Sequence, residues 1–116
     1  MTPTRPGVAY KVLSGAEFSR LRDAGSFAGS EADRADGFIH MSTADQLTET
    51  IARHYRDRGD LVVAAVDLAQ LGDAVRWEIS RGDQEFPHLY GALPIDAVTA
   101  AVPLARGGDG EVILPG

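Results

Sequence analysis

The stretch "DLVVAAVDL", residues 60–68, decides the fold, because it is an almost unbroken apolar run. Its valines favour extended backbone, so the run predicts a β-strand. Strands that are apolar along their whole length are covered on both faces by other parts of a protein. We therefore expect this strand to be buried on both faces.

Shorter runs of β-forming residues lie on either side of this stretch. In "VRWEIS", residues 75–80, the side chains of Val75, Trp77 and Ile79 alternate with polar ones, which predicts a half-buried strand with these three inside. The segment 85–94 is expected to be irregular, because it contains two prolines. Further strands are predicted at 8–14, 37–42, 97–105 and 111–115, with a hairpin loop at 106–110 between the last two.

Two helix starts precede most of the strands. The capping-box spacing, Ser or Thr followed three residues later by Glu or Gln, occurs at residues 14–17 and 43–46. The first box predicts a helix that stops at Gly25, and the second a helix that ends near Gly59. Residues 25–36 are polar and rich in Gly and Ser, so they are expected to form a loop. Two early helices followed by mainly β structure predict an α+β fold with a mixed or antiparallel sheet.

The composition restricts the classes of protein. With 116 residues, the chain is expected to form a single domain, 1–116, with residues 1–7 as a flexible tail. The formal net charge of −6, from 17 acidic and 11 basic residues, argues against non-specific binding to nucleic acid. The absence of cysteine excludes a disulfide scaffold and a thiol nucleophile. No segment resembles a signal peptide or a membrane span, so we expect a cytoplasmic protein without a membrane partner, whose oligomeric state the sequence leaves open.

His40 is the first candidate for a functional residue, because it interrupts an apolar strand just before a helix begins. The N–H groups at a helix N-terminus bind anions, and the hydroxyls of Ser42 and Thr43 add donors there. This arrangement predicts a site for an anion such as phosphate. The alternative is that Ser42 or Thr43 only caps the helix and that His40 is a hydrogen-bonded core histidine. The residues alone favour neither interpretation.

His88 is the second candidate. It lies between Phe86 and Tyr90, and aromatic side chains around a histidine suit stacking on a flat ring. Arg76 and Arg81, a few residues earlier, are suited to holding the phosphates of such a ligand. The alternative is a packed loop whose rings close one end of the core.

Other arrangements of these residues match the sequence less well. His40, His88 and Glu78 have the ligand types of a His₂Glu zinc set, but their spacing carries no recognised signature, so no metal is predicted. A hydrolase that uses Ser42 would require a nucleophile-elbow sequence, which the chain lacks. His54 lies among arginines in the second predicted helix and is interpreted as structural or solvent-facing.

Three blocks of sequence resemble a family of small bacterial proteins catalogued as domain of unknown function 952. They are "DGFIHMSTADQL" (36–47), "DLVVAAVDLAQLGDAVRWE" (60–78) and "FPHLYGALPIDAV" (86–98). The resemblance extends from about Tyr10 to Leu104. This family is similar in fold to the ADP-ribosyltransferase superfamily, which uses NAD or ADP-ribosylated intermediates. The segment "FIHMSTADQL" also resembles a segment of the RNA 2′-phosphotransferases in that superfamily.

The resemblance implies an ADP-ribosyltransferase-like fold with a cleft for a nucleotide, NAD or an ADP-ribose derivative. His40 and His88 would be its catalytic residues, for ADP-ribosyl or phosphoryl transfer, and NAD its candidate substrate. Lys11 follows Tyr10 where the family usually has a histidine, which supports the alternative of a non-catalytic binding or interaction module. We expect His40 and His88 to lie within ~10 Å of each other on one concave surface. The expected ligand-binding residues are Lys11, Ser42, Thr43, Arg76, Arg81, Phe86 and Tyr90.

Overall fold

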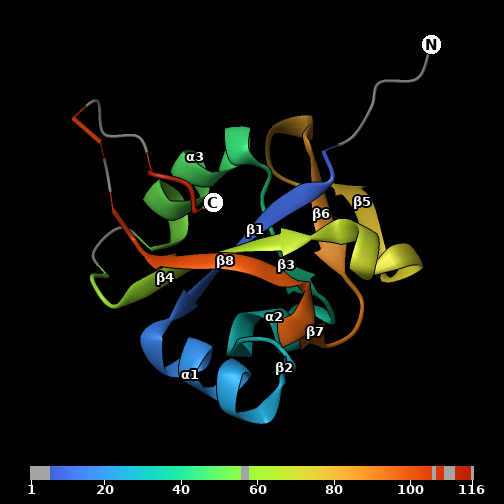
Figure 1. Cartoon of the computed structure of the whole chain (residues 1–116). Helices are drawn as coiled ribbons and strands as arrows, with labels where there is room; N and C mark the ends of the chain where they lie inside the picture. The colour runs from blue at the N-terminus through green and yellow to red at the C-terminus, as the bar shows by residue number, and fades with distance from the viewer. Residues whose placement is uncertain (1–5, 56–57, 106, 109–111, 116) are drawn as a thin grey trace.

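A three-stranded antiparallel sheet forms the centre of the molecule (Figure 1). The computed structural model describes residues 6–55, 58–105, 107–108 and 112–115, without the side chain of Arg81. In the sheet, β4 (Leu61–Asp67) lies between β1 (Val8–Ser14) and β8 (Val98–Pro103). Most side chains of β4 are buried, on both faces of the sheet, as the apolar run predicts.

Helices pack on opposite faces of this central sheet. On one face, Leu47 of α3 (Ala44–His54) packs in a cluster with Val63 of β4. On the other face, Leu21 of α1 (Gly15–Ala24) belongs to a second and larger cluster. Figure 1 shows the two helices on either side of the sheet. The predicted α+β class is confirmed, and the described sheets are antiparallel.

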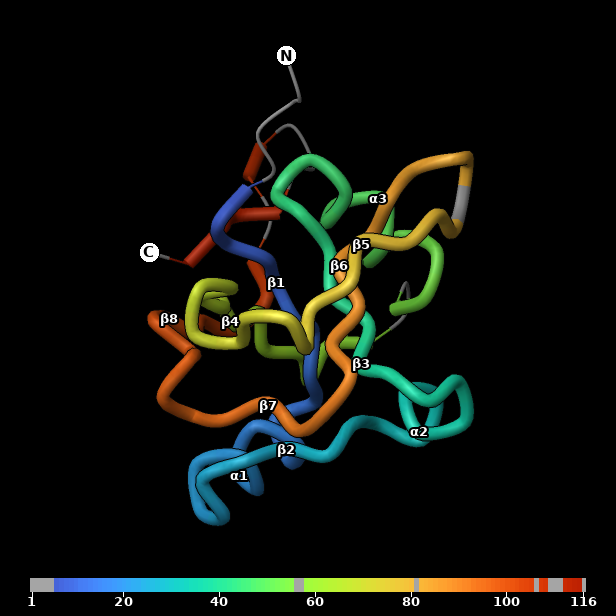
Figure 2. Tube along the Cα trace, turned by 90° about the vertical axis from the view of Figure 1, so that its right-hand side faces the viewer, coloured from blue at the N-terminus to red at the C-terminus, as the bar shows by residue number. Residues whose placement is uncertain are grey.

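A second sheet lies beside the first (Figure 2). It contains β3 (Ile39–His40), β6 (Glu85–Leu89) and β5 (Val75–Ile79), in the order β3-β6-β5. Tyr10 of β1 and Ser42, just after β3, exchange backbone hydrogen bonds of 2.7 and 2.9 Å. This bridge joins the two sheets, so β3 lies where they meet.

Residues 25–36 contain regular structure, and the prediction of a loop there is wrong. Ser30 and Asp33 form a capping box that begins a third helix, α2 (Glu31–Asp36). Before it, β2 (Ser26–Phe27) pairs with β7 (Leu93–Pro94). A six-residue helix is too short to show apolar periodicity, which explains why the sequence pattern did not reveal it. Single 3₁₀ turns occur at η1 (Leu68–Gln70), η2 (Gly72–Ala74) and η4 (Ile95–Ala97). The segment η3 (Arg81–Asp83) is an irregular turn, with φ of 65° at Gly82 and 60° at Asp83.

The expectation of an irregular segment at residues 85–94 is also wrong, since β6 runs through Pro87. Proline lacks an N–H donor, but a sheet accepts it where only its carbonyl is needed. Pro87 lies opposite Trp77 of β5, and its carbonyl oxygen accepts the N–H of Met41 at 3.2 Å. The proline therefore contributes to the sheet on the side of β3.

The ends of several elements differ from the predictions. Helix α1 begins at the predicted capping box and stops at Gly25 as expected, but α3 ends at His54, well before Gly59. Ile79 is 69% exposed, so only the first part of β5 faces inward. Among the described residues 112–115 there is no strand, and Val112 instead donates its N–H to Thr48 of α3 at 3.2 Å. The predicted tail and the 106–110 loop lie largely outside the described residues.

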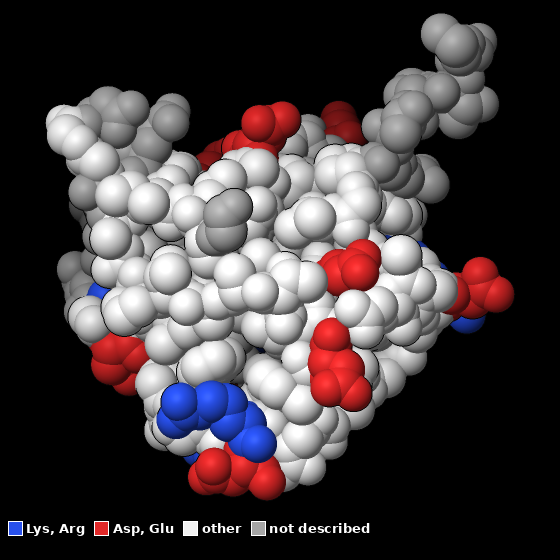
Figure 3. Space-filling model, in the orientation of Figure 1, with Lys and Arg blue, Asp and Glu red and all other residues white. Residues whose placement is uncertain are grey.

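The face of the molecule in front of β8 carries few charged side chains (Figure 3). In this view acidic groups lie right of the centre and along the edges of the face, and a basic group lies at its lower left. None of the helices in the described part of the chain is long and apolar enough to cross a membrane.

Candidate functional site

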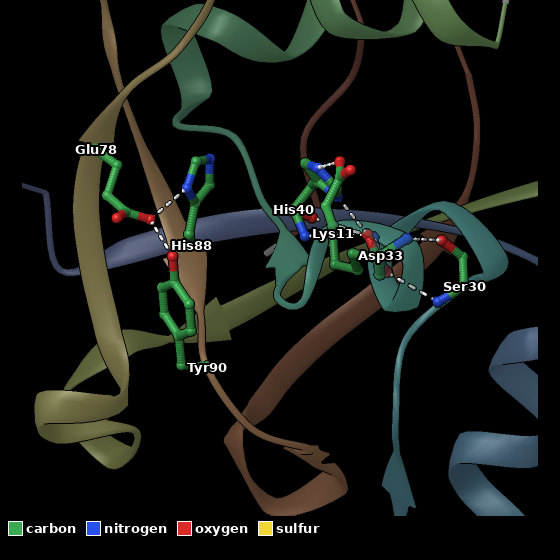
Figure 4. A network of polar contacts seen from close by, with 8 residues as sticks. Lys11, Ser30, Asp33, His40, Glu78, His88 and Tyr90 are labelled. Atoms are coloured by element: carbon green, nitrogen blue, oxygen red, sulfur yellow. Dashed lines mark hydrogen bonds and ion pairs between the residues drawn. The ribbon is translucent and has the colours of Figure 1, made fainter.

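The pairing of β3 with β6 places His40 directly opposite His88. Their ring centroids are 5.8 Å apart and the ring planes meet at 71°. Both side chains line one pocket, so the expected separation of less than ~10 Å at a shared concave surface is confirmed. Figure 4 shows that the two imidazoles come from neighbouring strands and that each has carboxylate neighbours of its own.

Asp33 is the buried partner of His40, and its side chain is 2% exposed. One carboxylate oxygen, Oδ1, accepts a hydrogen bond from Nδ1 of His40 at 2.6 Å and a second from the backbone N–H of the same residue at 3.1 Å. The other oxygen accepts Nζ of Lys11 at 2.8 Å and the backbone N–H of Ser30 at 2.9 Å. Burial alone opposes the charge of the carboxylate, but these donors outweigh it and hold the pKa of Asp33 well below its usual range.

The local sequence around Asp33 explains how a short helix positions this carboxylate. Ser30 accepts the N–H of Asp33 at 3.1 Å, which closes the capping box of α2. Gly37 ends the helix in the left-handed conformation, with φ of 88°. Gly29 has φ of 112°, and a Cβ at this position would lie 2.9 Å from Cβ of Asp33. Glycine at position 29 therefore allows the backbone to pass close to the buried aspartate.

The second ring nitrogen of His40 also contacts a carboxylate. Nε2 lies 2.9 Å from Oδ2 of Asp36, in the last turn of α2. Carboxylates only accept hydrogen bonds, so both contacts form together when both ring nitrogens carry a proton. The side chain of His40 is 40% exposed and that of Asp36 is 56% exposed, so the contact with Asp36 is accessible to solvent, unlike the contact with Asp33.

His88 has a similar arrangement on the other side of the pair. Its Nδ1 lies 2.8 Å from Oε1 of Glu78, which also accepts the hydroxyl of Tyr90 at 2.7 Å. The hydrogen bond from Tyr90, and after it the one from His88, lowers the pKa of Glu78. The same bond to Glu78 raises the pKa of Tyr90. Phe38 stacks on the imidazole of His88, with a centroid distance of 4.0 Å and an interplanar angle of 17°.

The contact with Glu78 fixes the tautomer of neutral His88. Because the carboxylate accepts, Nδ1 carries the proton and Nε2 has a free lone pair. Nε2 has no hydrogen-bond partner among the described residues, whereas every fully buried side-chain nitrogen and oxygen among them has one. The side chain is 7% exposed and lines the pocket, and Nε2 is not fully buried, because every fully buried side-chain nitrogen among the described residues has a partner.

The pocket has a volume of about 560 Å³, within the range of small-molecule sites. Its walls come from β1, α2, β3, the second half of α3 and β6. Its lining includes the carboxylates of Glu17, Glu31, Asp33 and Asp36, the rings of Tyr10, Tyr55, Phe86 and the three histidines, the hydroxyls of Ser30, Ser42, Thr50 and Ser80, and Arg58. His54, interpreted from the sequence as structural or solvent-facing, is therefore one of the lining residues.

Four of the nine predicted site residues line this pocket: His40, His88, Ser42 and Phe86. Lys11 does not, because it alternates with Tyr10 along β1 and its amino group is buried against Asp33. Thr43 does not either, and its backbone N–H donates to Gln46 at the start of α3, at 3.0 Å. The hydroxyl of Ser42 lies 3.0 Å from that of Thr50.

The remaining predicted residues lie on the β5 side of His88. The guanidinium of Arg76 sits over the ring of Tyr90, 4.9 Å from its centroid, and neither residue lines the pocket. The side chain of Arg81 lies outside the described residues. Among the described residues, no group of three or more His, Cys, Asp or Glu side chains is placed to hold a metal ion, which includes the set His40, His88 and Glu78.

Sequence reasoning did not identify Asp33 and Asp36 as site residues. The signal for Asp33 was the spacing Ser30-x-x-Asp33, which is that of a capping box with aspartate in place of glutamate. The boxes at residues 14–17 and 43–46 precede longer helices, and this one lies in a segment that otherwise reads as a loop. No sequence signal indicated that the box would bring its aspartate against His40.

The fold and the site together define an α+β domain in which two histidines, each held by a carboxylate, face one pocket. The model of the family described as "Protein of unknown function (DUF952)" matches residues 12–101, so the chain belongs to this family. The chain is also similar to protein CC0527 from Caulobacter crescentus. The crystal structure of that protein is 43% identical, covers 92% of this chain and 94% of its own, and has a TM-score of 0.84.

The solution NMR structure of the same Caulobacter crescentus protein gives a similar result. It is 43% identical, covers 92% of this chain and 91% of its own, and has a TM-score of 0.78. The comparison with curated proteins gave no significant match.

Proposed function

We propose that the domain binds a small ligand in the pocket and that His40 and His88 act on it as an acid–base pair. The observation that carries the proposal is that two imidazoles on paired strands, each bound at Nδ1 by a carboxylate, line the same cavity. A histidine that served only the core would satisfy its nitrogens inside the protein. Here His88 lines the pocket with no partner for Nε2 among the described residues, and Nε2 of His40 contacts only an exposed carboxylate.

The two histidines are suited to different roles. Neutral His88 presents a lone pair to the pocket and would accept a proton from a ligand hydroxyl or amine. Doubly protonated His40 would donate from Nε2 once a ligand group displaces Asp36. Asp33, which holds Nδ1 of His40 and does not need to contact a ligand, is a positioning residue in this scheme. An acid and a base on one ligand are what a transfer reaction requires.

A nucleotide, NAD or an ADP-ribose derivative is the ligand that the resemblance to ADP-ribosyltransferases supports, with ADP-ribosyl or phosphoryl transfer as the reaction. In that arrangement ribose hydroxyls would meet His40, His88 and the carboxylates, and the phosphates would lie toward Arg58. The alternative is a non-catalytic module that uses the same pocket for binding alone. Consumption of NAD by the purified protein would distinguish these two possibilities.

The proposal is tested by NMR titration, with the ring signals of His40 and His88 observed directly. The probes are ADP-ribose, NAD, benzylamine and benzyl alcohol, and the control is Ala32→Trp, in which a large ring on α2 fills the pocket lining. We expect at least one probe to shift both ring signals in a saturable manner, and the shift to disappear in the variant. If every probe leaves both histidines unchanged, or shifts them equally in Ala32→Trp, the pocket is not the ligand site.

A further inference from the structure

The charged groups of the pocket are predominantly acidic. Glu17, Glu31 and Asp36 add three carboxylates to the lining besides Asp33, whose charge is balanced by Lys11 and His40. The lining includes a single Lys or Arg among the described residues, which is Arg58. Its Nε lies 3.5 Å from Oδ1 of Asp60, so this guanidinium already has a carboxylate partner. An anionic ligand would enter a site of its own charge sign.

The hydrogen-bonding groups of the pocket also favour a cation with donors, because a buried histidine of the lining has an acceptor without a partner among the described residues. Nε2 of His88 belongs to a side chain that is 7% exposed, and with Nδ1 bound to Glu78 the neutral ring can only accept there. The carboxylates of Glu31 and Asp36 are acceptors as well. A ligand that satisfies these groups must bring hydrogen-bond donors.

The aromatic side chains complete the environment. Tyr10, Tyr55 and Phe86 line the pocket, and ring faces attract cations electrostatically. Burial raises the pKa of Tyr55, and the negative charges of Asp33 and Glu17 raise it further, while Arg58 opposes this effect. Two carboxylates of the lining thus act on this hydroxyl in addition to its burial.

From these three observations we infer that the pocket recognises a small organic cation with N–H donors, a primary or secondary ammonium group attached to an apolar body. The inference rests on the pocket and the acid–base pair of the proposed function. It names a ligand class of opposite charge to NAD and ADP-ribose, so it replaces the nucleotide as the expected ligand of the same site. The ammonium lies among Glu31, Asp36 and Nε2 of His88, and the apolar body packs against Tyr55 and Phe86. Entry of the ammonium displaces Asp36 from His40, so binding and the exposure of His40 Nε2 are linked.

A series of benzyl compounds separates charge from hydrogen bonding. Benzylamine is a cation with three N–H donors, benzyltrimethylammonium is a cation without them, benzyl alcohol is neutral, and benzoate is an anion. At low ionic strength we expect benzylamine to bind about ten-fold more tightly than benzyl alcohol, with benzyltrimethylammonium between them and no saturable binding of benzoate. The readout is the titration of the His40 and His88 ring signals.

Variants test the same assignment from the protein side. Glu31→Gln removes one lining carboxylate and should weaken the binding of benzylamine about three-fold or more, without affecting the binding of benzyl alcohol. Asp23→Asn is the matched control, since Asp23 is an exposed residue of α1 outside the pocket, and its removal changes the net charge equally. If both variants weaken the binding of benzylamine equally, the effect comes from the net charge of the protein and not from the pocket. That result would overturn the inference.

The outcomes distinguish the inference from the proposed function. If benzyl alcohol, benzoate or ADP-ribose shifts the two histidines as strongly as benzylamine, the pocket binds ligands but does not select cations, and only the inference fails. If benzyltrimethylammonium binds as tightly as benzylamine, the N–H donors do not contribute to binding and the assignment to an amine is wrong. If none of these probes shifts either histidine, the proposed function fails as well.

Discussion

Nδ1 of His40 lies 2.6 Å from Oδ1 of Asp33, which is the shortest of the four hydrogen bonds that this buried carboxylate accepts. The four donors come from three places in the sequence: Lys11 on β1, Ser30 before α2, and His40 on β3. A single carboxylate thus connects β1 of the central sheet, the short helix α2 and the strand β3. The predictions below follow from this connection and from its counterpart at His88.

Asp33→Asn should strongly destabilise the protein. The substitution leaves the ammonium of Lys11 buried, 2% exposed, without a charged partner. Breaking a buried ion pair on one side costs about 3–5 kcal/mol of the free energy of unfolding. Urea denaturation measures the loss. Asp36→Asn is the control, because it removes an exposed carboxylate from the same histidine and should cost less than about 1 kcal/mol. Equal effects of the two variants would mean that Asp33 does not hold the fold together.

Acid should destabilise the protein partly through Asp33. The folded-state pKa of Asp33 lies below its value in the unfolded chain, so the carboxylate contributes stability above the unfolded value of about 4. That contribution is lost as the pH falls below about 4, because the unfolded state then binds a proton that the folded state does not. Unfolding free energies measured at intervals from pH 6 to pH 2 should show a steeper decline for the wild type than for Asp33→Asn. Parallel curves would contradict the assignment.

The neutral form of His88 should be the tautomer with its proton on Nδ1. A histidine side chain in water favours the opposite tautomer, with the proton on Nε2, so the preference here reports on Glu78, whose Oε1 lies 2.8 Å away. Long-range ¹H–¹⁵N spectra recorded at about pH 8.5, where imidazoles are ordinarily neutral, distinguish the two nitrogens. In Glu78→Leu the preference should weaken or reverse, while Tyr90→Phe, which removes only the second donor to Glu78, should preserve it.

Gly29→Ala should disturb the site through the backbone. The residue has φ of 112°, and the added methyl would lie 2.9 Å from Cβ of Asp33. Backbone strain at such a position costs about 1–3 kcal/mol, and relief of the clash would shift the carboxylate away from His40. Gly7→Ala is the control, since a Cβ at that position meets nothing within 4 Å. Thermal unfolding measures the stability, and the His40 ring signals should shift in Gly29→Ala alone.

The sequence by itself determined the features that depend on local pattern. The apolar run at residues 61–66 indicates a strand that is buried on both faces of a sheet. The capping box at residues 14–17 fixes where α1 begins. His40 and His88 could also be selected as candidates, because a polar side chain in an apolar run requires a partner or a function.

Only the tertiary structure decided which partners these side chains have. Asp33 and Lys11 are 22 residues apart, and Glu78 is 10 residues from His88. Such contacts depend on strand register and on the exit angle of a six-residue helix, which no periodicity in the sequence encodes. The same dependence explains why Lys11 and Arg76, both predicted to bind the ligand, do not line the pocket. A side chain turns to one face or the other by the alternation of its strand, and the fold determines which face borders the cavity.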